Sequence, residues 1–160
     1  MLIRLRQLLR RGSGQEGAAA VEFALLILPL VLLIGGGLDF GHAYYIQHLI
    51  TTASREGARY GVKYSVDSST GLPFVPSALT PSISNYVKLP APTGLNYSNL
   101  LPGDANLTVT PGGAGYASNT AGAILTVTVT ANKHWFFLGG LLGLTNPKTL
   151  TATTAMSLER

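Results

Sequence analysis

A glutamate at the mouth of an apolar run is the residue of this chain whose position most needs a chemical explanation. Glu22 lies in "GQEGAAAVEFALLILPL", Gly14 to Leu30, among side chains that are mostly small or apolar. An ionised carboxylate costs about 2.5–3.5 kcal/mol at the centre of a bilayer, so a membrane span gains nothing from it. A carboxylate is tolerated in apolar surroundings when a cation pairs with it, which raises the question of which cation Glu22 could meet.

Two interpretations of Glu22 need no cation. In the first, Glu22 marks the cytoplasmic edge of an ordinary signal anchor. In the second, residues 1–37 form a secretory signal, and Gly35–Gly37 supply small residues before its cleavage point. Against the second, the region that leads into the apolar run contains two glutamates, and Pro29 interrupts the run.

A third interpretation supplies the cation by cutting the chain after Gly17. The cut frees the α-amine of Ala18, whose ordinary pKa of about 8 keeps it largely cationic. Glu22 then becomes the fifth residue of the mature chain, one helical turn from the amine. It could neutralise its own amine or that of a neighbouring subunit.

The other reactive side chains form no catalytic, cofactor-binding or metal-binding constellation, so we expect a protein that is not an enzyme. The chain has no cysteine, which excludes disulfides and thiolate sites. His42 and His48 are six residues apart and would face different sides of a helix. "GSGQEG" matches the glycine pattern of dinucleotide sites, but no strand precedes it. Trp135 and the two phenylalanines after it follow a predicted strand, and we expect them to fill the core or cap the sheet.

The element that carries Glu22 is predicted to be a membrane-spanning helix over residues 18–38. At about 1.5 Å per residue, this run covers the roughly 30 Å of a bilayer core. Charged residues make up only 11% of the 160 residues, and no Lys or Arg lies between Arg11 and Arg55. Four arginines precede the run: Arg4, Arg6, Arg10 and Arg11. This asymmetry predicts a cytoplasmic N-terminus and a C-terminus outside, and not a nucleic-acid patch.

The helical pattern continues over residues 39–64. Apolar or small residues recur at spacings of four and three, a narrow packing seam: Ile46, Ile50, Ala53, Gly57, Tyr60 and Tyr64. Arg55, Arg59 and Lys63 form a basic stripe on another face, for which a solvated surface and contact with an acidic neighbouring subunit both remain open.

Residues 65–160 are predicted to form a small extracytoplasmic α+β domain after a turn-rich linker. A short helix is expected near Ser82–Leu89. Three segments alternate with period two and are expected to be strands: Asn106–Pro111, Ala123–Phe137 and Lys148–Leu158. The fold class is therefore α+β, with a long N-terminal transmembrane helix packed on a small C-terminal antiparallel sheet. So small a sheet has a thin core of its own, which is why we expect it to pack on the helix.

These residues together resemble the TadE-like family of pseudopilins. The resemblance extends over Glu16–Gly61 and is weak elsewhere. The motifs that carry it are a small-residue leader junction, Val21-Glu22-Phe23, Pro29 in a Leu-rich segment, Asp39-Phe40-Gly41, and Arg55-Glu56-Gly57-Ala58-Arg59. The closing "MSLER" is also similar. One departure is His42, where a basic residue, usually arginine, is common in the family.

The resemblance implies a pilin-like minor pilin of the tight-adherence (Tad, type IVc pilus) machinery, anchored in the bacterial inner membrane. A prepilin peptidase would remove residues 1–17 as a leader, with Gly17 its last residue and Ala18 the first of the mature chain. Glu22 would carry the charge pairing between subunits, and Phe23 the contact beside it. The implied partners are the peptidase, other pilins and pseudopilins, the inner-membrane assembly platform and, after assembly, an extracellular pilus. The alternatives are an unprocessed, signal-anchored extracytoplasmic binding module and an enzyme with an unrecognised site.

Overall fold

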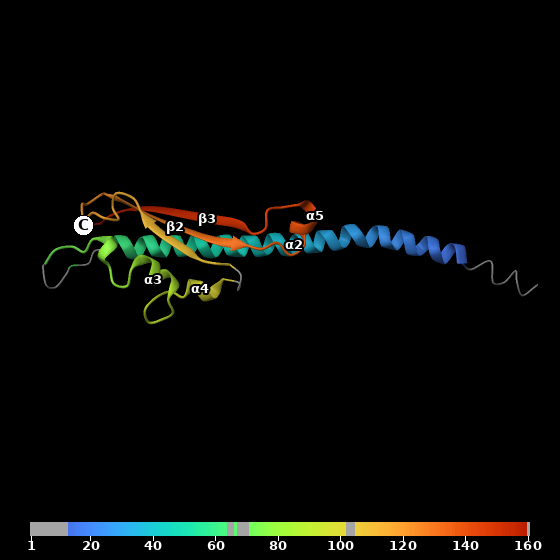
Figure 1. The fold of residues 1–160 in the computed structure, drawn as a ribbon, viewed down its shortest axis with the longest axis horizontal. Coiled ribbons are helices and arrows are strands. Elements are labelled where there is room, and N and C mark those ends of the chain that lie inside the picture. The colour runs from blue at the N-terminus through green and yellow to red at the C-terminus, as the bar shows by residue number, and fades with distance from the viewer. Residues whose placement is uncertain (1–12, 64–65, 67–70, 102–104, 160) are drawn as a thin grey trace, which may run out of the picture.

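The computed structural model describes residues 13–63, 66, 71–101 and 105–159. The four N-terminal arginines and Tyr64, on which some expectations rest, lie outside them. One helix dominates the described part: α2 runs without a break from Ser13 to Val62, through Pro29. Figure 1 shows this long helix with the described residues that follow it gathered on its C-terminal half. The expected continuation of the apolar helix past Asp39 is confirmed, and α2 ends two residues earlier than predicted.

The C-terminal part is a three-stranded antiparallel sheet of order β1-β2-β3. Its strands are β1 (Thr108–Gly112), β2 (Ile124–Lys133) and β3 (Lys148–Ser157). All three expected strands are present, so the α+β class is confirmed. The second strand is five residues shorter than predicted: it begins one residue later, and it ends four residues earlier because the chain leaves the sheet at His134.

Short helical segments fill the connections. They are the 3-10 turn η1 (Pro76–Ala78), α3 (Ile83–Lys88), α4 (Tyr97–Leu100) and α5 (Leu138–Leu142). The helix expected near residues 82–89 is α3, and the Ser82 hydroxyl caps it by accepting the Asn85 N–H. α4 and α5 lie outside the segments that were predicted to be helix or strand.

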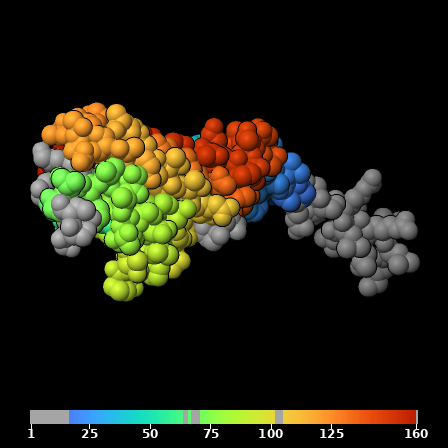
Figure 2. Space-filling model, turned by 60° about the vertical axis from the view of Figure 1, so that its left-hand side comes forward, coloured from blue at the N-terminus to red at the C-terminus, as the bar shows by residue number. Residues whose placement is uncertain are grey.

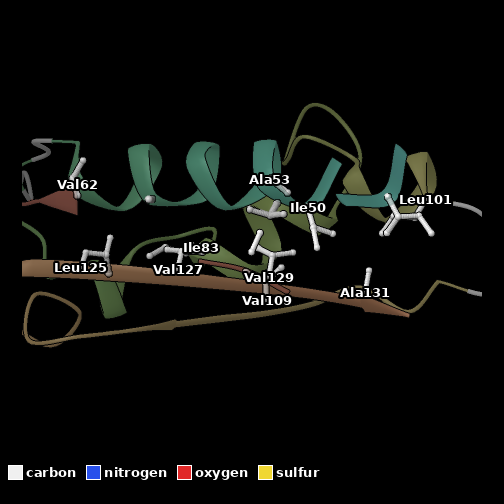
Figure 3. Close-up of a cluster of buried hydrophobic side chains, with 14 of the residues drawn as sticks. Ile50, Ala53, Val62, Ile83, Leu101, Val109, Leu125, Val127, Val129 and Ala131 are labelled. Atoms are coloured by element: carbon white, nitrogen blue, oxygen red, sulfur yellow. The ribbon is translucent and has the colours of Figure 1, made fainter. Parts of the chain in front are cut away.

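The core lies between the C-terminal half of α2 and one face of the sheet. The predicted seam residues Ile46, Ile50 and Ala53 are fully buried and pack with the inward-facing residues of β2. Figure 3 shows Leu125, Val127, Val129 and Ala131 pointing from β2 toward the helix. Small residues on the helix permit this close approach: a Cβ at Gly61 would lie 2.4 Å from Cδ2 of Leu125.

The outer faces are polar. Arg55, Arg59 and Lys63 are exposed, so the basic stripe is a surface of α2. On the outer face of the sheet, threonines pair across the strands, as Thr128 does with Thr153 through their hydroxyls at 3.0 Å. The domain therefore buries one face of its sheet against its own helix, as its small size requires.

Candidate functional site

The four residues assigned to processing and assembly lie together at the N-terminal end of α2. Gly17, Ala18, Glu22 and Phe23 are all helical and exposed. Ala18 and Glu22 are four residues apart, so they are neighbours on one face of the helix. Within the residues that the structure describes, Glu22 makes no hydrogen bond or ion pair. Its pairing with a freed amine stays a prediction.

The helix surface around these residues is bare. Every residue from 18 to 34 is exposed, and none of the described residues of the domain covers this stretch. By length and composition, α2 is able to cross a membrane, which is consistent with a single-pass anchor. The bare stretch and the domain meet at Asp39, where a second and unexpected cluster of polar groups lies.

Asp39 holds the connection between β2 and β3 onto the helix. Its Oδ1 accepts hydrogen bonds from Lys133 Nζ at 3.1 Å and from the Phe136 N–H at 2.8 Å. Its Oδ2 accepts the N–H groups of Phe137 and Leu138 at 2.8 and 2.9 Å. These four donors and the carboxylate are called the Asp39 cluster below. Three of the bonds end on backbone amides, so they fix the path of the chain as it leaves β2.

The charges of the Asp39 cluster are buried and paired. The side chains of Asp39 and Lys133 are both fully shielded from solvent. Lys133 Nζ also donates to the His134 carbonyl and lies 4.6 and 5.0 Å from the ring centroids of Phe136 and Trp135. Removing one partner of such a pair costs about 3–5 kcal/mol, since the other charge stays buried alone.

Electrostatics keep Asp39 ionised. Burial raises the pKa of this carboxyl, but the backbone N–H groups of Phe136, Leu138 and Phe137, with the Lys133 ammonium, outweigh burial and hold the pKa well below its usual range. His42 lies beside the cluster with its ring 5.2 Å from that of Phe136. Burial and the Lys133 charge lower the pKa of His42 against the opposing effect of Asp39, and its buried Nδ1 has no hydrogen-bond partner. The neutral imidazole is the form that fits there.

Glycine and aromatic residues complete the junction. A Cβ at Gly35 would lie 2.8 Å from Cγ of Phe137, so only glycine lets this ring lie on the helix. The rings of Phe40 and Trp135 meet edge to face at 6.2 Å. Two places were expected for these aromatic residues, the core and the end of the sheet, and Phe136, which is 66% exposed, does not fill the core. They lie at the end of β2, against the helix.

Part of this cluster is visible in the pattern of the sequence. Lys133 is the fifth residue in the inward phase of β2, after four apolar residues, so its ammonium had to be buried in the core. Asp39 is the first charged residue after the uncharged helical run that begins at Phe23, and no local pattern pairs it with Lys133. Among the described residues, no group of three His, Cys, Asp or Glu side chains could hold a metal ion.

The fold and this geometry define a class: an α+β protein with one long helix, bare and apolar at its N-terminal end and held to a small sheet at its other half. Residues 17–59 match the family model described as TadE-like protein, which confirms the resemblance over this segment. The match is consistent with a TadE-like Tad pilus protein, and it ends before the first strand. No curated protein and no solved structure matches the chain.

Proposed function

We propose that this chain is a membrane-anchored minor pilin, or pseudopilin, of a Tad (type IVc) pilus system. It is cut after Gly17 by a prepilin peptidase and acts by packing its N-terminal helix against other subunits. In this proposal the chain carries no catalytic role. The observation that supports it most is that the TadE-like match, residues 17–59, includes the bare, apolar half of α2.

The bare half of α2 is an apolar surface whose exposure to water is unfavourable. Large apolar side chains such as Leu25 and Leu33 are more than two-thirds exposed. Lipid would cover them while the protein is in the membrane, and the apolar helices of neighbouring pilins would cover them after assembly. The domain stays on the other half of α2, so it need not rearrange for this transfer.

Glu22 fits a bundle of neighbouring pilin helices better than it fits the lipid bilayer. In lipid its carboxylate is only a cost. After the proposed cut, a cationic Ala18 amine must enter a packed helix bundle, where an unpaired charge costs several kcal/mol. Glu22 is spaced to meet that amine on its own helix or on a neighbour. Phe23 lies next to it and would provide the apolar contact.

Orientation follows from charge. The arginines at positions 4, 6, 10 and 11 precede the span, and the residues after it carry no basic side chain until Arg55. Positive charge is retained on the cytoplasmic side, so the proposal places the N-terminus in the cytoplasm and the domain outside the inner membrane.

The test is intact-mass measurement on protein extracted from membranes of cells that contain or lack the peptidase. We expect loss of residues 1–17 only where the peptidase is present. Gly17→Leu should block the cut, because a protease subsite that accepts glycine excludes a large side chain. Gly37→Leu is the matched control, since a Cβ meets nothing within 4 Å at either position.

The outcomes separate the alternatives. A mature chain that starts after Gly37 would support a secretory signal. A full-length chain in both strains would support the unprocessed, signal-anchored binding module. Either result would overturn the proposal.

A further inference from the structure

We propose that the connection between β2 and β3, residues 134–147, is a second membrane contact. It would enter the headgroup region and outer acyl chains of the bilayer that α2 crosses, on the side where the domain lies. This inference depends on α2 crossing a membrane but not on cleavage or pilus assembly.

The connection presents an uncharged apolar surface. Phe136, Leu141 and Leu142 are 66%, 56% and 61% exposed, and Phe137 and Leu144 add to the same stretch. Between positions 134 and 147, His134 is the one residue with a titratable side chain. Contiguous exposed apolar surface of this kind marks a contact with another apolar phase.

The place of this surface along α2 points to lipid. α5 lies against the helix at the end of the domain from which the bare stretch emerges (Figure 1). Figure 2 shows orange-red atoms of the C-terminal part directly against the blue atoms of the helix. The contacts are specific: a Cβ at Gly35 would touch Phe137, and one at Gly36 would lie 3.8 Å from Leu138.

The rise per residue of α2 gives the depth in the bilayer at which Phe137 meets Gly35. A span that begins at Ala18 covers roughly 30 Å by Asp39, which places Asp39 at the far edge of the hydrocarbon core. Gly35 lies one turn back, about 6 Å deeper along the helix axis. The ring of Phe137 on Gly35 is therefore level with acyl chains, and a bilayer around the helix must meet it.

The aromatic residues are of the kind that gathers at membrane interfaces. Trp135 packs on Phe40, and Tyr44 is exposed one turn further along α2. Tryptophan and tyrosine are enriched where hydrocarbon meets water, because one part of the side chain is apolar and another donates a hydrogen bond.

The Asp39 cluster lowers the free-energy cost of placing the irregular β2–β3 connection in the bilayer. Non-helical backbone is expensive in lipid unless protein groups satisfy its polar atoms. Asp39 accepts the three consecutive N–H groups from Phe136 to Leu138, and the Trp135 indole N–H donates to the Thr145 carbonyl at 3.1 Å. The charge of Lys133 is enclosed in the same cluster, so it is not presented to lipid.

The chain contains one tryptophan, Trp135, so its fluorescence reports this segment without any substitution. In liposomes that contain the full-length protein, we expect lipids brominated near the headgroup end of the acyl chain to quench Trp135, and aqueous iodide to quench it weakly. Strong iodide quenching without bromolipid quenching would overturn the proposal. Flotation of the same liposomes reports insertion of α2 independently.

A second measurement uses the absence of cysteine from the chain. Leu142→Cys places a thiol in the proposed contact, and Asn119→Cys places one at an exposed position in the β1–β2 connection, at the opposite end of the sheet. At low protein-to-lipid ratio, a membrane-impermeant maleimide should label the first at least about tenfold more slowly, since thiolate attack requires water. The rates should become equal in denaturing detergent. Equal rates in liposomes, or protection that arises only at high protein density, would overturn lipid contact; the latter would indicate contact between copies of the chain.

Discussion

Replacing Asp39 with asparagine should detach the β2–β3 connection from the helix while leaving the sheet intact. The substitution preserves the shape of the side chain and removes its charge. One oxygen remains to accept a hydrogen bond, but an NH2 group would occupy one of the two carboxylate oxygen positions. At the Oδ2 position it would face the N–H groups of Phe137 and Leu138, and donors cannot bond to donors.

The size of the effect follows from burial. Lys133 would keep its ammonium in a fully shielded position without a counter-ion, and loss of one partner of a buried pair costs about 3–5 kcal/mol. The connection can escape this cost by leaving the helix and returning Lys133 to water. At tenfold per 1.4 kcal/mol, the open form should become roughly 100- to 4,000-fold more populated.

Hydrogen exchange of the backbone amides measures this population directly. In Asp39→Asn, the amides of Phe136, Phe137 and Leu138 should exchange faster by that factor. Amides within the β2–β3 ladder, such as that of Val129, are an internal control and should be unchanged. Exchange at the parent rate for all three amides would refute the reasoning, because it would mean that the carboxylate does not hold the connection.

A double variant tests separately how much of the effect comes from the Lys133 ammonium that has lost its counter-ion. Lys133→Met in the Asp39→Asn background removes the stranded ammonium and keeps a side chain of similar length. Its exchange should be slower than in Asp39→Asn alone, since the effects of contacting residues are not additive. If the second substitution speeds exchange further, the ammonium is not the source of the cost.

Three further predictions concern packing, pH and assembly. Gly61→Ala should lower the free energy of unfolding by about 1–3 kcal/mol, because its Cβ would clash with Leu125. Gly41→Ala is the control and should not lower it, since a Cβ there has nothing within 4 Å. Denaturant titration compares the two variants, and equal stability would contradict the packing. Because the folded pKa of Asp39 is lowered, its contribution to docking is complete above the ordinary carboxyl pKa of about 3.9 and is lost as pH falls below it. Amide exchange corrected for its intrinsic pH dependence should show this loss in the parent but not in Asp39→Asn. Glu22→Gln should leave processing and insertion intact but reduce the pilus-associated fraction of processed protein, and assembly at the parent level would refute charge pairing.

The sequence predicted the elements whose patterns are local. The seam containing Ile46 and Ile50 follows helical periodicity, and the alternation from Leu125 to Ala131 follows strand periodicity. Each signal is local: the first repeats within a few turns of one helix, and the second within a few residues of one strand. The helix and the strands could therefore be assigned without tertiary information. The leader junction and the role of Glu22 depend on the family resemblance and on the place of Glu22 four residues after Ala18, and they stay predictions.

The Asp39 cluster as a whole could not be found by such patterns, although strand alternation places Lys133 on the inward face of the sheet. It joins residues almost a hundred positions apart, and the N–H groups that it binds belong to backbone, which carries no sequence signature. The apolar run after Lys133 continued the strand pattern, and only the distant carboxylate shows why the chain turns at His134. The contacts of Glu22 are beyond prediction from one chain for another reason, since its proposed partner is a different subunit.

The location of the Asp39 cluster has a mechanical consequence. A tensile force applied to the bare end of α2 enters the domain at Asp39, where four hydrogen bonds meet the helix side by side. Because β2 lies alongside the helix, an axial pull would shear these bonds and the core contacts behind them together, whereas a sideways pull would peel them apart one after another. The rate of rupture under load depends on the barrier to unfolding and not on the equilibrium stability. The junction is therefore most resistant to rupture when the pull follows the helix axis.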